Sequence, residues 1–318
     1  MASSSPLPAA PAVAVVLAAV LAACGASSVQ PAANPGENAP EPPSNPAEGK
    51  QLFGALCSGC HGARGDGKSA VAAHLFPAPR DLTRGEYRFR STASGALPLR
   101  ADLLRSLALG LPGSAMPGWQ EQLTDRQLLS LVLFLETLSP RFAAEPRQAE
   151  DLLVPADVTE VAETPATIER GRQLYVQLKC GECHGADGRG DGLAAATAKN
   201  SDGTLSHVFD FTYGVYKGGM RPLDVYRTFV TGLDGSPMPS YDQSIPAVAD
   251  RWALVHYVRS LGRSKGAAFY ATERPRWRDP LQDQPELRPA APPERPLAGA
   301  ASGEATEPAP AGGSLEGF

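Results

Sequence analysis

The feature that most constrains this chain is a five-residue motif, Cys-x-x-Cys-His, which occurs twice. Its key residues are Cys57, Cys60 and His61 in the first copy and Cys180, Cys183 and His184 in the second. This motif is the attachment signature of c-type haem, in which the thiols form thioether bonds to the vinyl groups and the histidine ligates the iron. Cysteines three positions apart lie on one side of a helical turn, and the next residue faces the metal. Zinc sites and redox dithiols share the C-x-x-C spacing, but the adjacent histidine and the duplication favour two covalently bound haem c groups.

The fifth cysteine, Cys24, lies at the end of an apolar segment near the N-terminus. Haem attachment of this type takes place outside the cytoplasmic membrane, so an export signal is expected. Residues 12–23 form an apolar run of 12 residues, which is short for a membrane-spanning helix and typical of a signal peptide. Small residues before Cys24 resemble a bacterial lipobox, which predicts lipidation of Cys24 and a membrane-anchored lipoprotein on the periplasmic side of the cell envelope. No Lys or Arg precedes Lys50, which is unusual for a signal peptide, so an uncleaved anchor and an ordinary signal remain alternatives.

The surroundings of the two motifs also repeat, at an offset of about 122 residues. In each half, a Gly-x-x-x-aromatic element precedes the motif and an Asp-x-Thr-x-Gly element follows it. A Gly-Leu-x-Gly-Ser-x-Met-Pro element comes last. This agreement indicates two copies of one folding unit. Each copy is small for a hydrophobic core of its own, and a haem adds a large apolar surface to bury.

Changes in composition mark the ends of the two copies. Stretches rich in proline, alanine or acidic residues flank and separate them. The predicted organisation is a signal peptide with lipobox (1–24), a disordered tether (25–45), domain 1 (46–140), a linker (141–163), domain 2 (164–262) and a proline-rich, mostly disordered tail (263–318).

Helical patterns open and close each copy. Domain 1 is predicted to begin with a helix near Pro46 and to end with one over 124–138, which Thr124 can cap and Pro140 can stop. In domain 2, the pattern resumes at Thr164 and closes with a helix over 248–261.

The whole pattern resembles the class I, mitochondrial-type cytochromes c, in particular bacterial members with two domains and one haem in each. The resemblance covers both predicted domains. It implies an all-α fold of two tandem cytochrome c domains, in which the first and last helices of each domain cross. The Gly-x-x-x-aromatic elements, Gly49 with Phe53 and Gly171 with Tyr175, suit a close helix crossing beside an aromatic side chain.

The sixth iron ligand decides what such a protein does, because an open position binds small molecules and a filled one leaves only electron transfer. Met116 and Met238 occupy the repeated Gly-Ser-x-Met-Pro element. A thioether favours ferrous iron and raises the potential relative to bis-histidine ligation, while the neighbouring glycine and proline shape the loop. We predict that Met116 and Met238 ligate the two irons, opposite His61 and His184.

Other residues of ligand or aromatic type have less specific roles. Met220 has no counterpart in domain 1 and is expected to pack in the core. Three unrepeated histidines are expected to be surface or hydrogen-bonded residues: His74, His207 and His256. Trp119 and Tyr241 each follow a methionine by three residues and either pack on the haem or fill the core.

In the resembled family, a proline carbonyl commonly accepts the free N–H of the proximal histidine. Pro77 or Pro79 is the expected acceptor for His61. No proline lies between His184 and Pro222, so the acceptor in domain 2 is left open and the two haems are expected to differ in potential.

The charge distribution limits the class of partner. The formal net charge of −5 gives no support for a nucleic-acid partner. Between Arg64 and Arg105, however, domain 1 carries eight basic and four acidic residues. These basic residues could pair with haem propionates, dock an acidic partner, or form a solvated surface.

These features favour an electron carrier over an enzyme. The predicted protein is a membrane-tethered dihaem cytochrome that passes single electrons from a dehydrogenase or quinol-oxidising complex to an oxidase or reductase. An electron-transfer subunit fixed to one oxidoreductase complex would have the same ligands and remains an alternative. A dihaem peroxidase is disfavoured because it needs a sixth position that can be vacated, and thiosulfate-oxidising enzymes often need a cysteine ligand, for which no cysteine is left.

Overall fold

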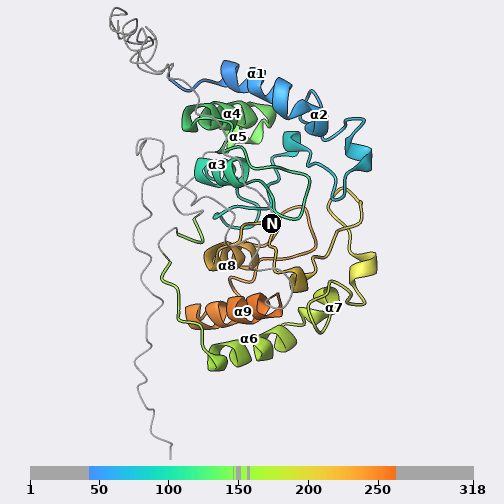
Figure 1. Ribbon diagram of the computed structural model, residues 1–318, viewed down its shortest axis with the longest axis vertical. Helices are drawn as coiled ribbons and strands as arrows, with labels where there is room; N and C mark the ends of the chain where they lie inside the picture. Colours follow the sequence, from blue (N-terminus) through green and yellow to red (C-terminus); the bar gives the residue numbers. More distant parts are fainter. Residues whose placement is uncertain (1–42, 146, 148–151, 156–157, 263–318) are drawn as a thin grey trace, which may run out of the picture. The chain divides into compact units, whose positions relative to one another are not determined.

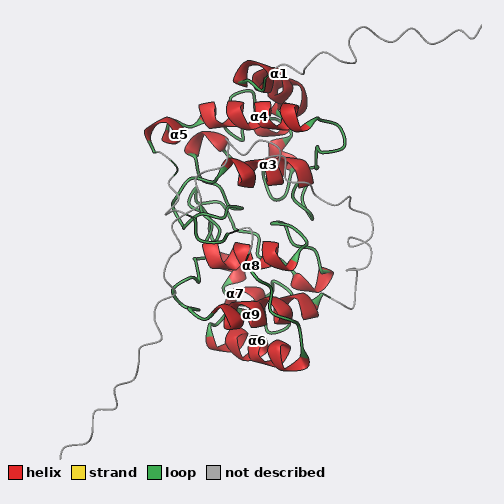
Figure 2. Cartoon of the chain, turned by 90° about the vertical axis from the view of Figure 1, so that its left-hand side faces the viewer, coloured by secondary structure: helices red, strands yellow, loops and turns green. Residues whose placement is uncertain are grey.

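The computed structural model describes residues 43–145, 147, 152–155 and 158–262, and the regular secondary structure within these ranges is helical. Within these ranges there is no β-strand, only two isolated β-bridges, and Figure 2 shows helices joined by long loops. The predicted all-α fold is confirmed. The predicted signal peptide, Cys24, most of the tether and the tail lie outside the described residues. No helix in the described part is long and apolar enough to cross a membrane.

The same succession of helices occurs in each half of the chain (Figure 1). The first half contains α1 (Pro46–Leu56), α2 (Ser58–His61), η1 (Ala72–His74), η2 (Leu82–Arg84), α3 (Arg100–Leu109), α4 (Asp125–Leu138) and α5 (Arg141–Ala144). The second half contains α6 (Pro165–Gln177), α7 (Gly181–His184), η4 (Ala195–Thr197), η5 (Phe211–Tyr213), α8 (Pro222–Thr231) and α9 (Val248–Leu261). Only α5 has no counterpart among the described residues of the second half.

The helix ends follow the capping residues in the sequence. The side chain of Thr124 accepts a hydrogen bond from Gln127 N at the start of α4, and that of Thr164 accepts one from Thr167 N at the start of α6. Helix α4 ends at Leu138, before Pro140, as predicted. The hydrophobic stripes of α4 and α9 are buried, and each domain has its own core.

The first and last helices of each domain cross at a glycine. Figure 1 shows α1 beside α4, and α6 beside α9, and these pairs make the most extensive helix contacts. A Cβ added to Gly49 would lie 1.9 Å from Ser130 O, and one added to Gly171 would lie 2.0 Å from Ala253 O. Aromatic pairs flank the crossings, Phe53 with Phe134 at 5.3 Å and Tyr175 with Tyr257 at 5.2 Å between ring centroids. The predicted glycine–aromatic crossing is therefore present in both domains.

The described residues between the two domains contact both of them. After Pro140 the chain forms α5, where Arg141 donates hydrogen bonds to Gly85 O at 2.9 Å and Gly95 O at 2.8 Å. Val154 is 1 % exposed and belongs to the core of domain 2, while its backbone N–H donates to Ser91 O of domain 1 at 3.0 Å. The segment thus contributes to both domains.

The crossing predicts a large difference between two glycines of the same helix. Gly49→Ala is expected to lower the free energy of unfolding by ~1–3 kcal/mol or more, because the new methyl group meets a backbone carbonyl. Gly54→Ala is the matched control, since nothing lies within 4 Å of its added Cβ, and it should be neutral or stabilising by up to ~1 kcal/mol. Guanidinium unfolding followed by circular dichroism measures both. Equal effects would contradict the crossing geometry.

Candidate functional site

The first helix of domain 1 leads directly into its Cys-x-x-Cys-His motif. Cys57 is both the C-cap of α1 and the N-cap of α2. Its carbonyl accepts hydrogen bonds from Cys60 N at 3.1 Å and His61 N at 2.9 Å. In domain 2, Cys180 O accepts from His184 N at 2.9 Å in the same way. Each motif therefore forms one short helical turn that brings its two cysteines and its histidine together.

The four motif cysteines are free thiols and all are half-buried. Burial raises the pKa of Cys57 and that of Cys180 to about 11. The first cysteine of each motif therefore faces the apolar interior of its domain, against whose core it packs. Unpaired thiols at the edge of an apolar core are the groups that thioether attachment requires.

The imidazole of His61 is held by a backbone carbonyl. Its Nδ1 lies 3.2 Å from Arg80 O, and burial lowers the pKa of His61, which favours the neutral ring. With the proton on Nδ1 donated to this carbonyl, the Nε2 lone pair is available to a metal. The expected acceptor, a carbonyl of Pro77 or Pro79, is wrong, because the chain turns so that the residue after Pro79 presents its carbonyl instead.

The imidazole of His184 has a different environment. Burial lowers its pKa, and the Phe209 carbonyl, which occupies the place of Arg80 O in the repeat, acts in the opposite direction. Nδ1 nevertheless has no hydrogen bond among the described residues. The Phe211 ring stacks on the imidazole, with 4.5 Å between centroids, where domain 1 has Leu82. Ring packing therefore orients His184 more than hydrogen bonding does.

The two methionine loops have the same internal hydrogen bonds. Leu111 N donates to Met116 O at 3.0 Å, and Ser114 Oγ donates to Leu111 O at 2.7 Å. The corresponding bonds around Met238 measure 3.1 Å and 2.7 Å. Both methionines are half-buried. The two loops thus present their methionines in equivalent local structures.

Several of the candidate site residues pack on one core in each domain. Cys57, Met116 and Trp119 pack on the core of domain 1, and Cys180, Met238 and Tyr241 pack on that of domain 2. The pKa of Tyr241 is raised to about 12, mainly by burial and also by the two thiols of its motif, so its hydroxyl lies near them.

Unpartnered donors support a bound group in domain 1. Tyr87 Oη and Trp119 Nε1 are buried and have no hydrogen-bond partner among the described residues, which is costly in a protein interior. Two thiols, a neutral imidazole, a thioether and buried donors around one apolar core are a set that fits haem c.

The other candidate residues have their own surroundings. Met220 Sδ accepts a hydrogen bond from Tyr216 N at 3.5 Å and packs on the core of domain 2. His74 and His207 are exposed. His256 is buried in α9, where its Nδ1 lies 2.9 Å from Thr167 Oγ1.

Most basic residues of the positively charged segment are paired within the protein. The ion pairs are Arg64–Asp66, Arg84–Glu86, Arg90–Asp234, Arg100–Glu136 and Arg105–Asp102. Arg90 and Arg105 are buried, and burial lowers the pKa of Arg80 and of Arg88. A solvated basic surface therefore does not describe this segment. Nothing in the sequence indicated that Arg90 would pair with domain 2.

Comparison with known proteins identifies a matching family and a similar chain of known structure. The model of the cytochrome c family matches residues 46–139 and again residues 168–262. Among solved structures, a chain of the Kuenenia stuttgartiensis reducing HAO-like protein complex Kustc0457/Kustc0458 is 39 % identical, with a TM-score of 0.63. The match covers 70 % of this chain and 99 % of that chain. No curated protein matches this sequence.

Removing one attachment motif should remove one haem. The Cys57→Ala/Cys60→Ala and Cys180→Ala/Cys183→Ala variants are each expected to carry one haem per chain where the parent carries two, because each motif serves its own domain. His74→Ala, an exposed histidine outside the motifs, should keep both haems. Intact mass and pyridine haemochrome absorbance give the count. A double variant that retains two haems would show that its motif is not an attachment site.

Proposed function

We propose that this chain, which belongs to the cytochrome c family and contains two of the family's domains in tandem, is an electron-transfer protein that relays single electrons. It holds two covalently bound haem c groups, one on Cys57 and Cys60 and one on Cys180 and Cys183. When bound, haem supplies one-electron redox chemistry at iron. The observation that carries the proposal is the pair of methionine loops, alike in hydrogen bonding and packed on the same cores as the thiols.

In each domain, one histidine and one methionine would hold the haem iron. His61 and His184 are half-buried residues whose pKa is lowered by burial, so each offers a neutral imidazole. Met116 and Met238 offer thioethers from the loops. With a histidine and a methionine both bound to it, the iron would have no position for a substrate, and the chemistry that haem would supply is one-electron transfer. A catalytic role would require one of these loops to withdraw.

Direct hydrogen bonds between the domains support transfer from one haem to the other. Arg88 Nη2 donates to Asn200 Oδ1 at 2.7 Å, and Ser201 Oγ donates to Glu86 Oε2 at 3.0 Å. Such contacts join the two haem-binding domains directly, which favours electron transfer within one chain.

The partners are redox proteins, and one arrangement has specific support. A similar chain is part of a solved protein complex, and this sequence matches 99 % of it. We therefore favour an electron-transfer subunit bound to one oxidoreductase complex over a freely diffusing carrier between a dehydrogenase or quinol-oxidising complex and an oxidase or reductase. A lipid on Cys24, on the periplasmic side of the envelope, would hold this subunit at a membrane.

Removing either methionine tests the ligation. Met116→Ala and Met238→Ala are each expected to let one ferrous haem per chain bind carbon monoxide, where the parent binds none. The midpoint potential of that haem should fall by on the order of 0.1 V or more, because axial ligands set haem potentials over a range of ~0.8 V. Optical redox titration with and without carbon monoxide measures both effects, with Met220→Leu as the control. Carbon monoxide binding by the parent protein would contradict the proposal for that domain.

A fixed subunit and a diffusing carrier respond differently to salt. If the chain is a subunit, the tagged protein purified from its own cells should retain one haem-containing partner in constant ratio from low to high ionic strength. A carrier that docks through surface charges should instead separate as ionic strength rises above ~0.1–0.2 M. Size-exclusion chromatography with light scattering gives the ratio. Elution of the lone chain at all salt concentrations would exclude the subunit arrangement.

A further inference from the structure

Arg90 of domain 1 is bound to the loop that carries Met238 of domain 2. It is 0 % exposed and lies in a segment with no equivalent in the other domain. The stretch from Gly85 to Asp102 is seven residues longer than the corresponding stretch from Gly214 to Asp224. The additional residues of domain 1 extend to domain 2 at this point.

The guanidinium of Arg90 is fully used by carbonyls and one carboxylate. Within domain 1, it donates to Tyr87 O at 3.2 Å and to Ala93 O at 3.1 Å. Across the domain boundary, it donates to Thr231 O at 2.9 Å and Gly232 O at 3.3 Å. Those two carbonyls end helix α8, where a cation is favoured.

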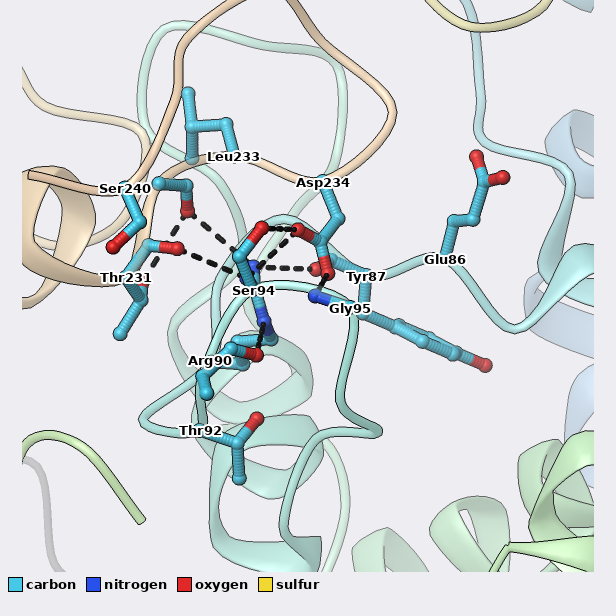
Figure 3. A network of polar contacts seen from close by, with 12 residues as sticks. Glu86, Tyr87, Arg90, Thr92, Ser94, Gly95, Thr231, Leu233, Asp234 and Ser240 are labelled. Atoms are coloured by element: carbon cyan, nitrogen blue, oxygen red, sulfur yellow. Dashed lines mark hydrogen bonds and ion pairs between the residues drawn. The ribbon is translucent and has the colours of Figure 1, made fainter. Parts of the chain in front are cut away.

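The fifth partner of Arg90 is Asp234, which lies within the methionine loop. The two side chains form an ion pair at 2.8 Å. Ser94 Oγ donates to the same carboxylate oxygen at 2.9 Å, and Gly95 N donates to the other at 3.0 Å. Figure 3 shows the Asp234 carboxylate directed at Ser94 and Gly95, with Arg90 between it and the end of α8. Domain 1 therefore holds both oxygens of Asp234.

Fixing Asp234 fixes the path of the chain to Met238. The loop leaves α8 at Gly232, passes Asp234, and closes on itself through Leu233 N and Met238 O at 3.1 Å. Arg90 binds the loop at its start and again at Asp234. The position of the Met238 side chain relative to α8 thus depends on contacts made by the other domain.

The loop of domain 1 has a proline where the loop of domain 2 has Asp234. Pro112 stands in the position of Asp234 in the repeat, and its ring restricts the backbone at that residue. The rest of the Met116 loop has the same hydrogen bonds. One methionine loop is stiffened by its own proline, and the other is held from outside.

We propose that Arg90 is a positioning residue for the second haem, and that domain 1 keeps Met238 in place through the Arg90–Asp234 pair. This inference rests on the proposed ligation of iron by Met238. Contacts at the domain boundary then influence the ligation and the potential of the haem in domain 2. The haem in domain 1 keeps its methionine ligand without them.

The test uses the full-length holoprotein with Arg90→Gln, Arg90→Lys and Asp234→Asn. In Arg90→Gln and Asp234→Asn, we expect carbon monoxide binding to rise from none toward one per chain. The methionine–iron charge-transfer band should lose up to half of its amplitude, and only one of the two potentials should fall. Arg90→Lys keeps the charge but not the planar set of donors, so a smaller effect is expected. Ser201→Ala, which removes boundary hydrogen bonds of Arg84 and Glu86 but none of Asp234, should leave both haems unchanged.

Combined variants identify the haem that responds. Arg90→Gln added to Met238→Ala should cause no further gain in carbon monoxide binding, whereas Arg90→Gln added to Met116→Ala should approach two per chain. Asp234→Pro, which copies the loop of domain 1, should restore the charge-transfer band in the Arg90→Gln background. A role in stability alone would not produce this rescue.

Several results would overturn the inference. One is a methionine–iron charge-transfer band of full amplitude in folded Arg90→Gln and Asp234→Asn proteins. Another is a loss of this band in Ser201→Ala as large as in Arg90→Gln. The third is carbon monoxide binding or a change of potential at the haem of domain 1. Asp234→Asn is isosteric and keeps the test decisive if Arg90→Gln does not fold. Failure of the proposed ligation would show itself separately, because the parent protein would then lack the methionine band in domain 2.

Discussion

In each domain, the first and last helices come so close at one glycine that backbone meets backbone, and the position of the haem site follows from this contact. Helix α1 crosses α4 at Gly49, and the attachment motif begins at the residue after α1 ends. The crossing therefore sets the distance from Cys57 to the core on which Met116 packs. Domain 2 has a similar crossing at Gly171, with the motif beginning three residues after α6 ends. A side chain at either glycine would separate the helices and shift the motif away from its methionine loop.

Ion pairs across the two crossings show which forces define the geometry. In domain 1, Glu48 of the first helix pairs with Arg126 of the last helix at 2.7 Å. In domain 2, Arg170 of the first helix pairs with Asp250 of the last helix at 2.7 Å. The acidic and basic partners have thus exchanged helices, while the crossing is the same. Ion pairs near the surface contribute little because water screens them, so close packing at the glycine and the aromatic side chains, rather than a particular charge pattern, determines the crossing.

The sequence predicted those elements whose signals are local. Helix starts at Thr124 and Thr164 follow from capping side chains, and the haem motifs follow from their spacing. Helices α3 and α8 were not predicted, because each buries charged residues, Asp102 and Asp224 among them, that disrupt an apolar stripe. The acceptor of His61 was misassigned by one residue, since the direction of a carbonyl depends on backbone angles that residue types do not specify. The partner of Arg90 lies 144 positions away, a distance at which pattern alone carries no information.

The domain boundary also explains why two similar units need not act independently. A Cβ on Gly113, in the Met116 loop, would lie 3.4 Å from the ring of Phe209, whose carbonyl acts on His184. A Cβ on Gly235, in the Met238 loop, would lie 3.0 Å from Nη1 of Arg80, whose carbonyl faces Nδ1 of His61. Each methionine loop therefore contacts the residue behind the histidine of the other domain. Residues of both candidate haem sites therefore meet at the domain boundary, and the Arg90–Asp234 pair is the contact there that bears on the Met238 loop.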